Sequence, residues 1–445
     1  SYFILLAGIL PFWTTRFVAR EYAGSAKTGL VANIVISVAS ASIYVALLPV
    51  ILSALQIAAA YSILYTIVSI QILELYITSA FESILHAKQP QVIGYGLLIH
   101  ELCKVAFGFL LIVEFQLGLL GAMCSIISSH IIQIAFYVML TAKELKENIR
   151  WTYLKEWLKA SPINIYAIIG SKIPLFTLIF LFVYGELARS YYGAANTIAS
   201  VISHSTFLAY ALYPKLLSQI NIEDVFTSLK MVLMFAIPMT IGAIILSDSY
   251  LTILSPAFTD ARLVLSILAI NALSTSLSGV SISLPGVFST VVMGTEKIDA
   301  QAKIPFKQLA KTRLFQIFTL PYVESAITLP PAFFALFYVA KTQLEAATYL
   351  ALINLIVGLV MLLCRYVIAY KCLAFNFPWK SVARYTVATA VMATLLFMIP
   401  HPTRLLLTAV LTVLGGIVYV VVLGAIDQET RGLIKSIVME AKSKL

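Results

Sequence analysis

The strongest constraint on this chain is a series of long windows that contain no Asp, Glu, Lys or Arg. Three of them are Thr28–Leu73, Phe115–Ala142 and Leu405–Ile426. A helix needs about 20 mostly apolar residues to cross the roughly 30 Å hydrocarbon core of a bilayer. Only 11% of the 445 residues are charged and 61% are hydrophobic, whereas a soluble domain carries about 25% charged residues. We therefore predict an all-α polytopic membrane protein, not a soluble enzyme, a secreted disulfide scaffold or a disordered chain.

About thirteen membrane helices are predicted when spans with a few charges are included. They cover residues 2–18, 28–52, 57–83, 91–113, 117–140, 161–185, 189–213, 228–248, 261–285, 314–339, 344–371, 382–399 and 404–425. The most polar stretch, 141–160, has Leu145, Ile149, Leu154 and Leu158 near helical spacing among charged residues. This pattern predicts an amphipathic helix in the headgroup layer, with five spans before it and eight after it.

The distribution of basic residues predicts the orientation in the membrane. When the segment after the first span is placed in the cytoplasm, the loops on the other side keep only Arg189, Arg262, Lys341 and Arg404 of the 30 Lys and Arg residues. Cytoplasmic loops collect Lys and Arg. We therefore expect a multi-pass protein of the cytoplasmic membrane with a cytoplasmic C-terminus, and this rule also accounts for the net charge of +10 without nucleic-acid binding.

Several other classes of function are disfavoured. The four cysteines form no CxxC pair and no Cys/His metal spacing, so neither a disulfide nor a metal or other cofactor is expected. The loops on the outer side are short and contain few acids, and no Walker A motif is present. An enzyme needs its acids, bases or nucleophiles gathered at one site. We therefore predict that the chain is not an enzyme.

Charged residues inside the spans are the candidates for a functional site. A charge near the bilayer centre costs about 2.5 kcal/mol or more, so it normally faces a cavity or a partner. Because Glu101 and Lys104 are three residues apart on one helix, they can pair, as a structural clamp near Glu74 or as part of a polar cavity that relays a cation or proton. Other polar candidates for the cavity are Glu324 and His204, although a lone membrane histidine is more often a packing residue.

Lys172 is the most informative of these charges. It is the only charge between Ala160 and Gly185, and it has no acid within helical reach. It must therefore face water or find a partner on another span, and Glu324 is the leading candidate for that partner. Arg16 lies near the cytoplasmic end of the first span.

The helix count and three local stretches resemble the MOP exporter superfamily, in particular its polysaccharide-flippase branch. Leu10–Gly24 is similar to the family's second helix, Ser190–Leu217 to its eighth helix, and Ser255–Lys297 to a long helix pair. The resemblance implies fourteen helices, the first of them absent here. It places the N-terminal lobe at 1–140, a connector at 141–160, the C-terminal lobe at 161–371 and two trailing helices with a tail at 372–445.

The resemblance also implies a function. A monomeric flippase would carry a lipid-linked oligosaccharide or polysaccharide precursor, on a polyprenyl phosphate or pyrophosphate, across the membrane by alternating access. Arg16, Arg20 and Lys172 would bind the phosphate by their charge, and a coupling cation would bind at the acids. Two alternatives stay open: a MATE-like cation-coupled exporter of small amphiphiles that uses Glu74 and Glu101, and a membrane scaffold without a central cavity.

Overall fold

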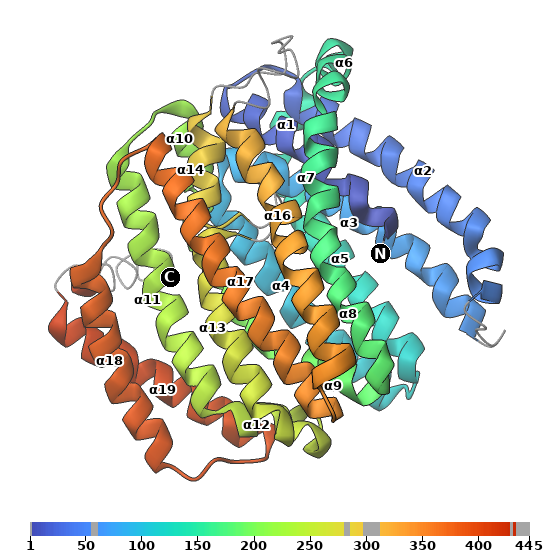
Figure 1. Cartoon of the computed structure of the whole chain (residues 1–445). Helices are drawn as coiled ribbons and strands as arrows, with labels where there is room; N and C mark the ends of the chain where they lie inside the picture. The colour runs from blue at the N-terminus through green and yellow to red at the C-terminus, as the bar shows by residue number, and fades with distance from the viewer. Residues whose placement is uncertain (1, 55–60, 280–284, 297–311, 428–429, 433–445) are drawn as a thin grey trace.

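The structure, a computed structural model, describes residues 2–54, 61–279, 285–296, 312–427 and 430–432. The secondary structure among these residues is helical (Figure 1). Lipid cannot hydrogen-bond to the backbone, so a spanning segment satisfies its own N–H and C=O groups as a helix. Eleven of the described helices are long and apolar enough to cross a membrane, and a shorter apolar helix covers Phe3–Ala19. The predicted all-α membrane fold is therefore confirmed.

The helices before the connector pack mainly on one another, and we call them the N-terminal bundle. α3 is central to this bundle because it contacts α1, α2, α4 and α5. The bundle consists of η1 (Tyr2–Gly8), α1 (Ile9–Ala19), α2 (Ser25–Ala54), α3 (Ser62–Lys88), α4 (Pro90–Gly108), η3 (Phe109–Glu114) and α5 (Gly118–Thr141). Pro90 starts α4 directly after α3 because a proline at the first helical position loses no intrahelical hydrogen bond.

The helices after the connector form what we call the C-terminal bundle, built around contacts of α13 with α9, α11 and α17. Its first part consists of α7 (Pro162–Lys172), η5 (Ile173–Phe176), α8 (Thr177–Phe180), η6 (Leu181–Tyr184), α9 (Gly185–Ser203), η7 (His204–Ala209), α10 (Leu212–Ser218), α11 (Ile222–Ile245) and α12 (Ser247–Leu254). The second part consists of η8 (Pro256–Ala261), α13 (Arg262–Ser278), α14 (Val287–Thr295), α16 (Arg313–Phe334), η9 (Ala335–Val339) and α17 (Gln343–Cys372).

One predicted span differs from a simple helix. The segment predicted at 261–285 is α13, and α14 follows it toward the same end of the molecule as α10 (Figure 1). α13 ends at Gly279, whose φ is +85°, and a Cβ there would lie 2.4 Å from the Gly286 nitrogen. Only glycine fits a positive φ with so close a backbone approach. The stretch compared with a long helix pair thus holds a helical span, Pro256–Ser278, followed after Gly279 by the nine-residue α14.

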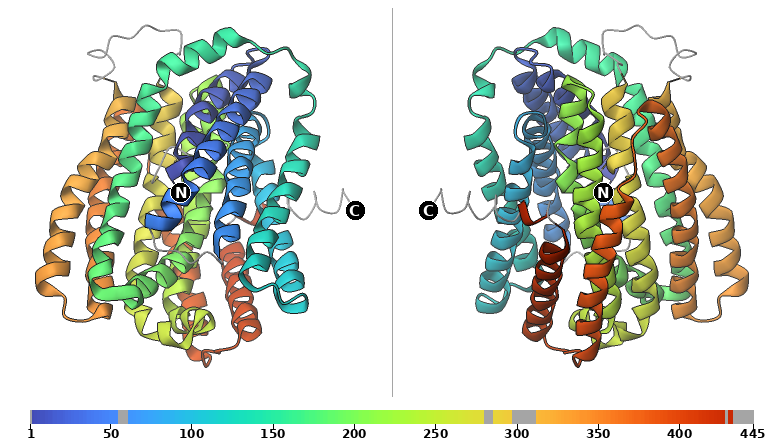
Figure 2. Two further views of the ribbon diagram at one scale, coloured as in Figure 1. Left: turned by 90° about the vertical axis from the view of Figure 1, so that its right-hand side faces the viewer. Right: turned by 90° about the vertical axis from the view of Figure 1, so that its left-hand side faces the viewer.

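The connector crosses one end of the molecule, which we call the α6 end (Figure 2). It contains η4 (Glu144–Lys146) and α6 (Trp151–Ala160). The Trp157 side chain is fully buried and packs edge to face against Phe17 at 5.3 Å, whereas Trp151 and Leu158 are exposed. α6 is thus anchored to α1 by one face and leaves an apolar and basic face outside, as expected for a helix in the headgroup layer.

The last two helices, α18 (Trp379–Met398) and α19 (Leu405–Ile426), form a hairpin whose first helix packs on α11. The Tyr419 hydroxyl on α19 donates to the Met234 carbonyl on α11 at 2.6 Å, so the hairpin is fixed to the C-terminal bundle. The basic residues at 297–311 and in the tail beyond 432, which are predicted to lie on the cytoplasmic side, fall outside the described residues.

Candidate functional site

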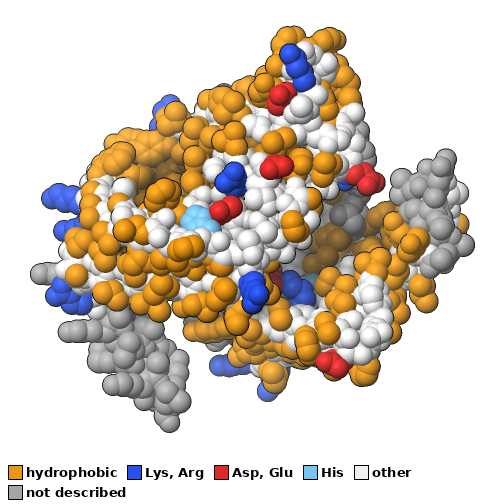
Figure 3. Space-filling view, turned by 90° about the horizontal axis from the view of Figure 1, so that it is seen from below, with side chains coloured by type: hydrophobic (Ala, Val, Ile, Leu, Met, Phe, Trp, Pro, Cys, Tyr) orange, Lys and Arg blue, Asp and Glu red, His pale blue; other side chains and the backbone are white. Residues whose placement is uncertain are grey.

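A cavity of about 530 Å³ lies between the two bundles. Its walls come from η1, α3, α4 and α5 of the N-terminal bundle and from α7 of the C-terminal bundle. The volume falls in the range of about 300–1,000 Å³ typical of small-molecule sites. We call it the main cavity. The space-filling view of the face opposite the α6 end shows a hollow with charged side chains of both signs at its wall (Figure 3).

Lys172 contributes the cation on the α7 wall of the main cavity. It is the last residue of α7 and is exposed in the structure. No ion pair joins its ammonium group to an acid within the described ranges. The predicted pairing with Glu324 is wrong, because the Glu324 carboxylate instead meets the Arg365 guanidinium at 3.3 Å. Lys172 therefore keeps its charge available to the cavity.

Arg365, the partner of Glu324, falls inside the predicted span 344–371 but is not among the predicted intramembrane charges. It lies inside α17, only 5% exposed, and its Nη1 also donates to the Ser278 hydroxyl at the end of α13, at 3.4 Å. A buried arginine needs both an acid and further hydrogen bonds, and α16 and α13 supply them. Neither Glu324 nor Arg365 lines the main cavity.

A chain of polar side chains crosses the N-terminal bundle beside the main cavity. The predicted pair is confirmed, since Lys104 Nζ lies 2.5 Å from the Glu101 carboxylate. Glu101 lies 3.9 Å from His100, and the rings of His100 and His130 are 4.1 Å apart. His130 in turn lies 3.9 Å from Glu74. Four contacts thus link five charged or imidazole side chains, from Lys104 to Glu74.

Glu74 ends this chain in the protein interior. It is 5% exposed, and neither carboxylate oxygen has a hydrogen-bond partner among the described residues. A buried carboxylate without hydrogen bonds is costly. Glu74 does not itself line the main cavity, although its neighbour Leu75 and Thr78, one turn further along α3, do. Glu74 is therefore a buried acid close to the main cavity but outside it.

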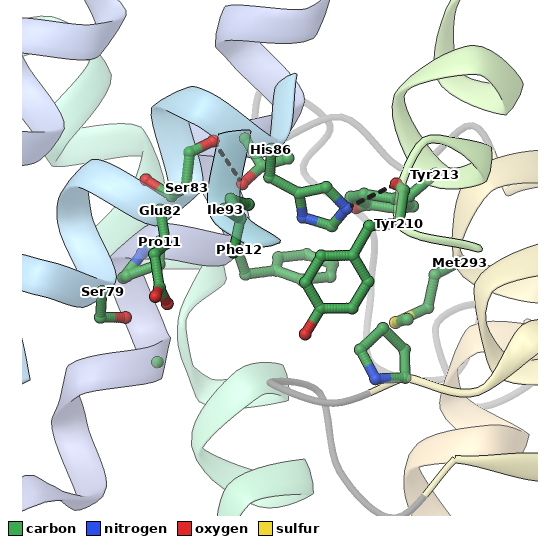
Figure 4. Close-up of a pocket in the computed structure, with 13 residues that line it drawn as sticks. Pro11, Phe12, Ser79, Glu82, Ser83, His86, Ile93, Tyr210, Tyr213 and Met293 are labelled. Atoms are coloured by element: carbon green, nitrogen blue, oxygen red, sulfur yellow. Dashed lines mark hydrogen bonds between the residues drawn. The ribbon is translucent and has the colours of Figure 1, made fainter. Parts of the chain in front are cut away.

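A second, smaller chamber of about 110 Å³ adjoins the main cavity toward the α6 end. Gly8, Ser79 and Glu82 line both. Figure 4 shows Glu82 and His86 of α3 on one side of the chamber and Tyr210, Tyr213 and Met293 on the other. The chamber thus lies on the contact surface between the bundles, which we call the seam.

Glu82 is a site residue that the sequence analysis missed. It falls at the end of the predicted span 57–83, where a charge is inexpensive and does not stand out as an intramembrane charge. In the structure it is half-buried, and it interacts with the hydroxyl of the fully buried Tyr137. A signal was present, because Glu74, Thr78 and Glu82 recur every four residues and so share one face of α3.

The seam is closed at the α6 end by side chains of the N-terminal bundle that bind the C-terminal bundle. Arg16, predicted to bind phosphate, is 1% exposed and donates from Nη1 to the Met293 carbonyl at 3.0 Å and from Nη2 to the Glu296 carbonyl at 2.8 Å. His86 contacts the Tyr210 carbonyl at 2.9 Å. In this conformation Arg16 lines neither cavity.

Two other predicted residues also lie away from both cavities. Arg20 follows α1 at the α6 end, where burial lowers its pKa and the charge of Arg16 lowers it further. His204 is exposed at the start of η7 and stacks on Phe207 at 5.5 Å. Near Arg16, burial raises the pKa of Glu296, while the charges of Arg313 and Arg16 oppose the rise. The α6 end thus gathers several charges of both signs.

Comparison with known proteins identifies the fold. No family model and no curated protein matches the chain. Among solved structures, an outward-facing multidrug resistance MATE family transporter of the MOP superfamily matches with a TM-score of 0.58 and 14% identity, covering 83% of this chain and 86% of that one. The Vibrio cholerae MATE transporter VcmN in its bent form matches with a TM-score of 0.59 and 14% identity, covering 86% of this chain and 87% of that one. The lipid II flippase MurJ, in an inward closed conformation, matches with a TM-score of 0.55 and 15% identity, covering 97% of this chain and 92% of that one.

These matches place the chain in the fold that MATE transporters and MurJ share. The resemblance to the MOP superfamily is therefore confirmed for the fold, but at these identities the matches do not separate its branches. All three similar proteins are named as transporters or flippases, none as an enzyme.

Proposed function

We propose that this chain is an alternating-access membrane transporter whose main cavity receives an anionic cargo, a glycan linked to a polyprenyl phosphate or pyrophosphate. One observation carries the proposal: Lys172 stands exposed on the wall of a cavity between two helix bundles, with no acid paired to it among the described residues. A cation kept without a partner inside the membrane is costly, and an anionic ligand would supply the missing partner. MurJ, of the same fold, is named as a lipid II flippase, which supports this class of cargo.

The arrangement of open and closed ends supports alternating access. The seam is closed at the α6 end by Arg16 and His86, while the opposite face is hollowed (Figure 3). The positive-inside rule assigns the α6 end to the cytoplasm. The conformation would then be open to the outside, and the cycle would alternate it with one in which the seam opens and the cargo enters from the cytoplasm.

A second candidate function rests on a different observation. The main cavity is not uniformly basic, because Glu82 and Glu101 also line it. A cavity with acids favours a cationic cargo, as in a cation-coupled exporter of small amphiphiles, with Glu74 as an ion-binding group. The ion pair of Glu101 with Lys104 neutralises one of these acids, and for this reason we place the anionic cargo first. A scaffold without transport would not need a cavity between its bundles.

The test is translocation of a fluorescent polyprenyl-phosphate-linked oligosaccharide in liposomes that contain the purified protein. We expect the wild type to move it and Lys172→Ala to move it about ten-fold more slowly or worse, the effect of losing a hydrogen bond to a charged group. The matched control is Lys341→Ala, which removes an exposed lysine between η9 and α17 and should leave the rate unchanged.

Three outcomes separate the candidates. Equal rates for the wild type and Lys172→Ala would keep the flippase and remove Lys172 from it. Movement of a cationic amphiphile but not of the lipid-linked glycan would replace the first candidate with the second. Movement of neither, under ion gradients of both signs, would contradict both.

A further inference from the structure

Arg16 binds the end of a short helix in the opposite bundle. The carbonyls that accept from its guanidinium, Met293 and Glu296, lie in and just after the last turn of α14. The final carbonyls of a helix have no intrahelical donor and carry the negative end of the helix dipole. Arg16 therefore satisfies groups that α14 cannot satisfy itself, and its planar fork allows it to bind two of them at once.

The surroundings hold the guanidinium in place. Arg16 Nη1 lies 3.3 Å from the Tyr213 hydroxyl of α10, and its Cζ lies 5.4 Å from the ring centre of Phe12. Gly294 of α14 packs so closely on Leu216 of α10 that a Cβ would lie 2.7 Å from the leucine side chain. α10 and α14 thus form one surface, and Arg16 is inserted into it from α1.

These contacts differ from those of the other buried arginine, Arg365. Glu324 and Ser278, which bind Arg365, belong to its own bundle, so they persist when the bundles move relative to each other. The carbonyls and the hydroxyl that bind Arg16 are all on the opposite side of the seam. Opening the α6 end must break these bonds and leave a guanidinium facing the opened space.

Arg16 also adjoins the path into the main cavity. Phe12, Tyr213 and Met293, which contact Arg16, line the smaller chamber. The chamber continues into the main cavity past Gly8, Ser79 and Glu82. A ligand released from Arg16 would therefore enter the smaller chamber first and then reach the main cavity, where Lys172 lies.

We propose that Arg16 has two alternating partners: the carbonyl end of α14, which it binds to lock the α6 end shut, and the phosphate of the cargo, which it binds when that end is open. Closure returns Arg16 to α14 and transfers the phosphate toward Lys172. The binding of the cargo phosphate by Arg16 rests on the proposed function, whereas the lock, the binding of the α14 carbonyls by Arg16, does not. The anion and the α14 carbonyls compete for one guanidinium, so a soluble anion should favour the open end.

The experiment measures opening of the seam by the reactivity of one cysteine. Ser83→Cys, in the smaller chamber, is introduced after the four native cysteines are replaced by alanine, and a membrane-impermeant maleimide is added at the α6 end. We expect Arg16→Ala and Arg16→Lys to be labelled about ten-fold faster than the protein with Arg16, since lysine keeps the charge but not the fork. Arg365→Ala is the matched control for loss of a buried arginine and should not speed labelling.

Inorganic pyrophosphate provides the second arm. It should speed labelling when Arg16 is present and have no effect on Arg16→Gln. Equal labelling of all the variants would overturn the lock, and Arg16→Lys covers the case in which Arg16→Ala does not fold. Faster labelling of the variants without an effect of pyrophosphate would keep the lock and overturn the binding of anion. Neither readout requires transport, so failure of the liposome assay alone would count against the proposed function and not against the lock.

Discussion

The two bundles hold their intramembrane charges in different ways. In the C-terminal bundle, Arg365 and Glu324 form an ion pair at 3.3 Å with side chains that are 6% and 27% exposed. In the N-terminal bundle, Glu74 is buried with no hydrogen bond among the described residues. At the cavity between the bundles, Lys172 of α7 has no ion pair with an acid in the described ranges. A charge satisfied inside one bundle stabilises the fold, whereas a charge left at a cavity is available to a ligand.

The largest effect should come from breaking the satisfied pair. Arg365→Met leaves Glu324 without its cation, and removal of one partner of a buried pair costs about 3–5 kcal/mol. The free energy of unfolding, followed by tryptophan fluorescence in detergent, should fall by this amount. Arg365→Met combined with Glu324→Leu should recover most of it. Lys172→Met is the matched control and should cost little, so a comparable loss from Lys172→Met would contradict the difference between a charge paired inside a bundle and a charge at the cavity.

A steric change tests how rigidly the polar groups of the N-terminal bundle are held. A Cβ on Gly96 would lie 2.2 Å from the ring of Tyr137, whose hydroxyl interacts with Glu82, while a Cβ on Gly94 would meet nothing within 4 Å. Overpacking costs about 1–3 kcal/mol. We expect Gly96→Ala to lower the free energy of unfolding by this amount and Gly94→Ala, on the same helix, to leave it unchanged. Equal effects would show that Tyr137 moves aside without cost.

Neutral replacements of the buried Glu74 and of the half-buried Glu324 should change the stability of the protein in opposite directions. Glu74→Gln removes a buried charge that has no hydrogen bond, so the protein should become more stable by about 1 kcal/mol. Glu324→Gln weakens the bond to Arg365 and should destabilise by about 1–3 kcal/mol. The midpoints of thermal unfolding of the two variants, measured side by side, decide this. A loss of stability in both would indicate that Glu74 has a partner in the membrane.

The smallest effect concerns a comparable pair outside the spans. Burial raises the pKa of Asp427, but hydrogen bonds from Thr430 and Arg384 outweigh this, and its pKa lies below the ordinary value. A depressed pKa stabilises the fold above the unfolded pKa of about 3.9, and this stabilisation is lost as the pH falls through the folded pKa.

The free energy of unfolding of the wild type should therefore exceed that of Asp427→Asn by about 1 kcal/mol near pH 7, and the difference should vanish at acid pH. Because the other titrating groups are the same in both proteins, their contribution cancels when the two free energies are subtracted. A difference that grows toward acid pH would have the wrong sign and would contradict the assignment of Asp427 as an ionised partner of Arg384.

The helices were predictable because the thickness of the bilayer sets a length that charge-free windows reveal directly. The predicted spans overlap helical segments of the structure, although the break at Gly279 was missed, since one glycine among apolar residues is a weak signal. Lys172 was predictable for the same reason as the helices: a single charge in an apolar span is conspicuous. Its partner was not predictable, because helical spacing cannot show which helices become neighbours.

Arg16 and Glu82 show where prediction from the sequence stops. Arg16 has the charge expected for a phosphate site, but the carbonyls that bind it lie 277 and 280 positions away in the chain, and a backbone carbonyl has no signature in the sequence. Glu82 lies near the end of its span, where a charge is inexpensive and therefore uninformative. Only the placement of α1 and α3 against α10 and α14 gives these two residues a role.

Binding of an anionic cargo in the main cavity can be measured through the reactivity of a cysteine at position 172 in the protein reconstituted in liposomes. Lys172→Cys, without the native cysteines, should react with an impermeant thiol reagent added at the face opposite the α6 end. A polyprenyl-phosphate-linked oligosaccharide should slow this reaction, and a cationic amphiphile should not. Reaction from neither face, or protection by the cationic amphiphile alone, would contradict the claim that this cavity receives an anionic cargo.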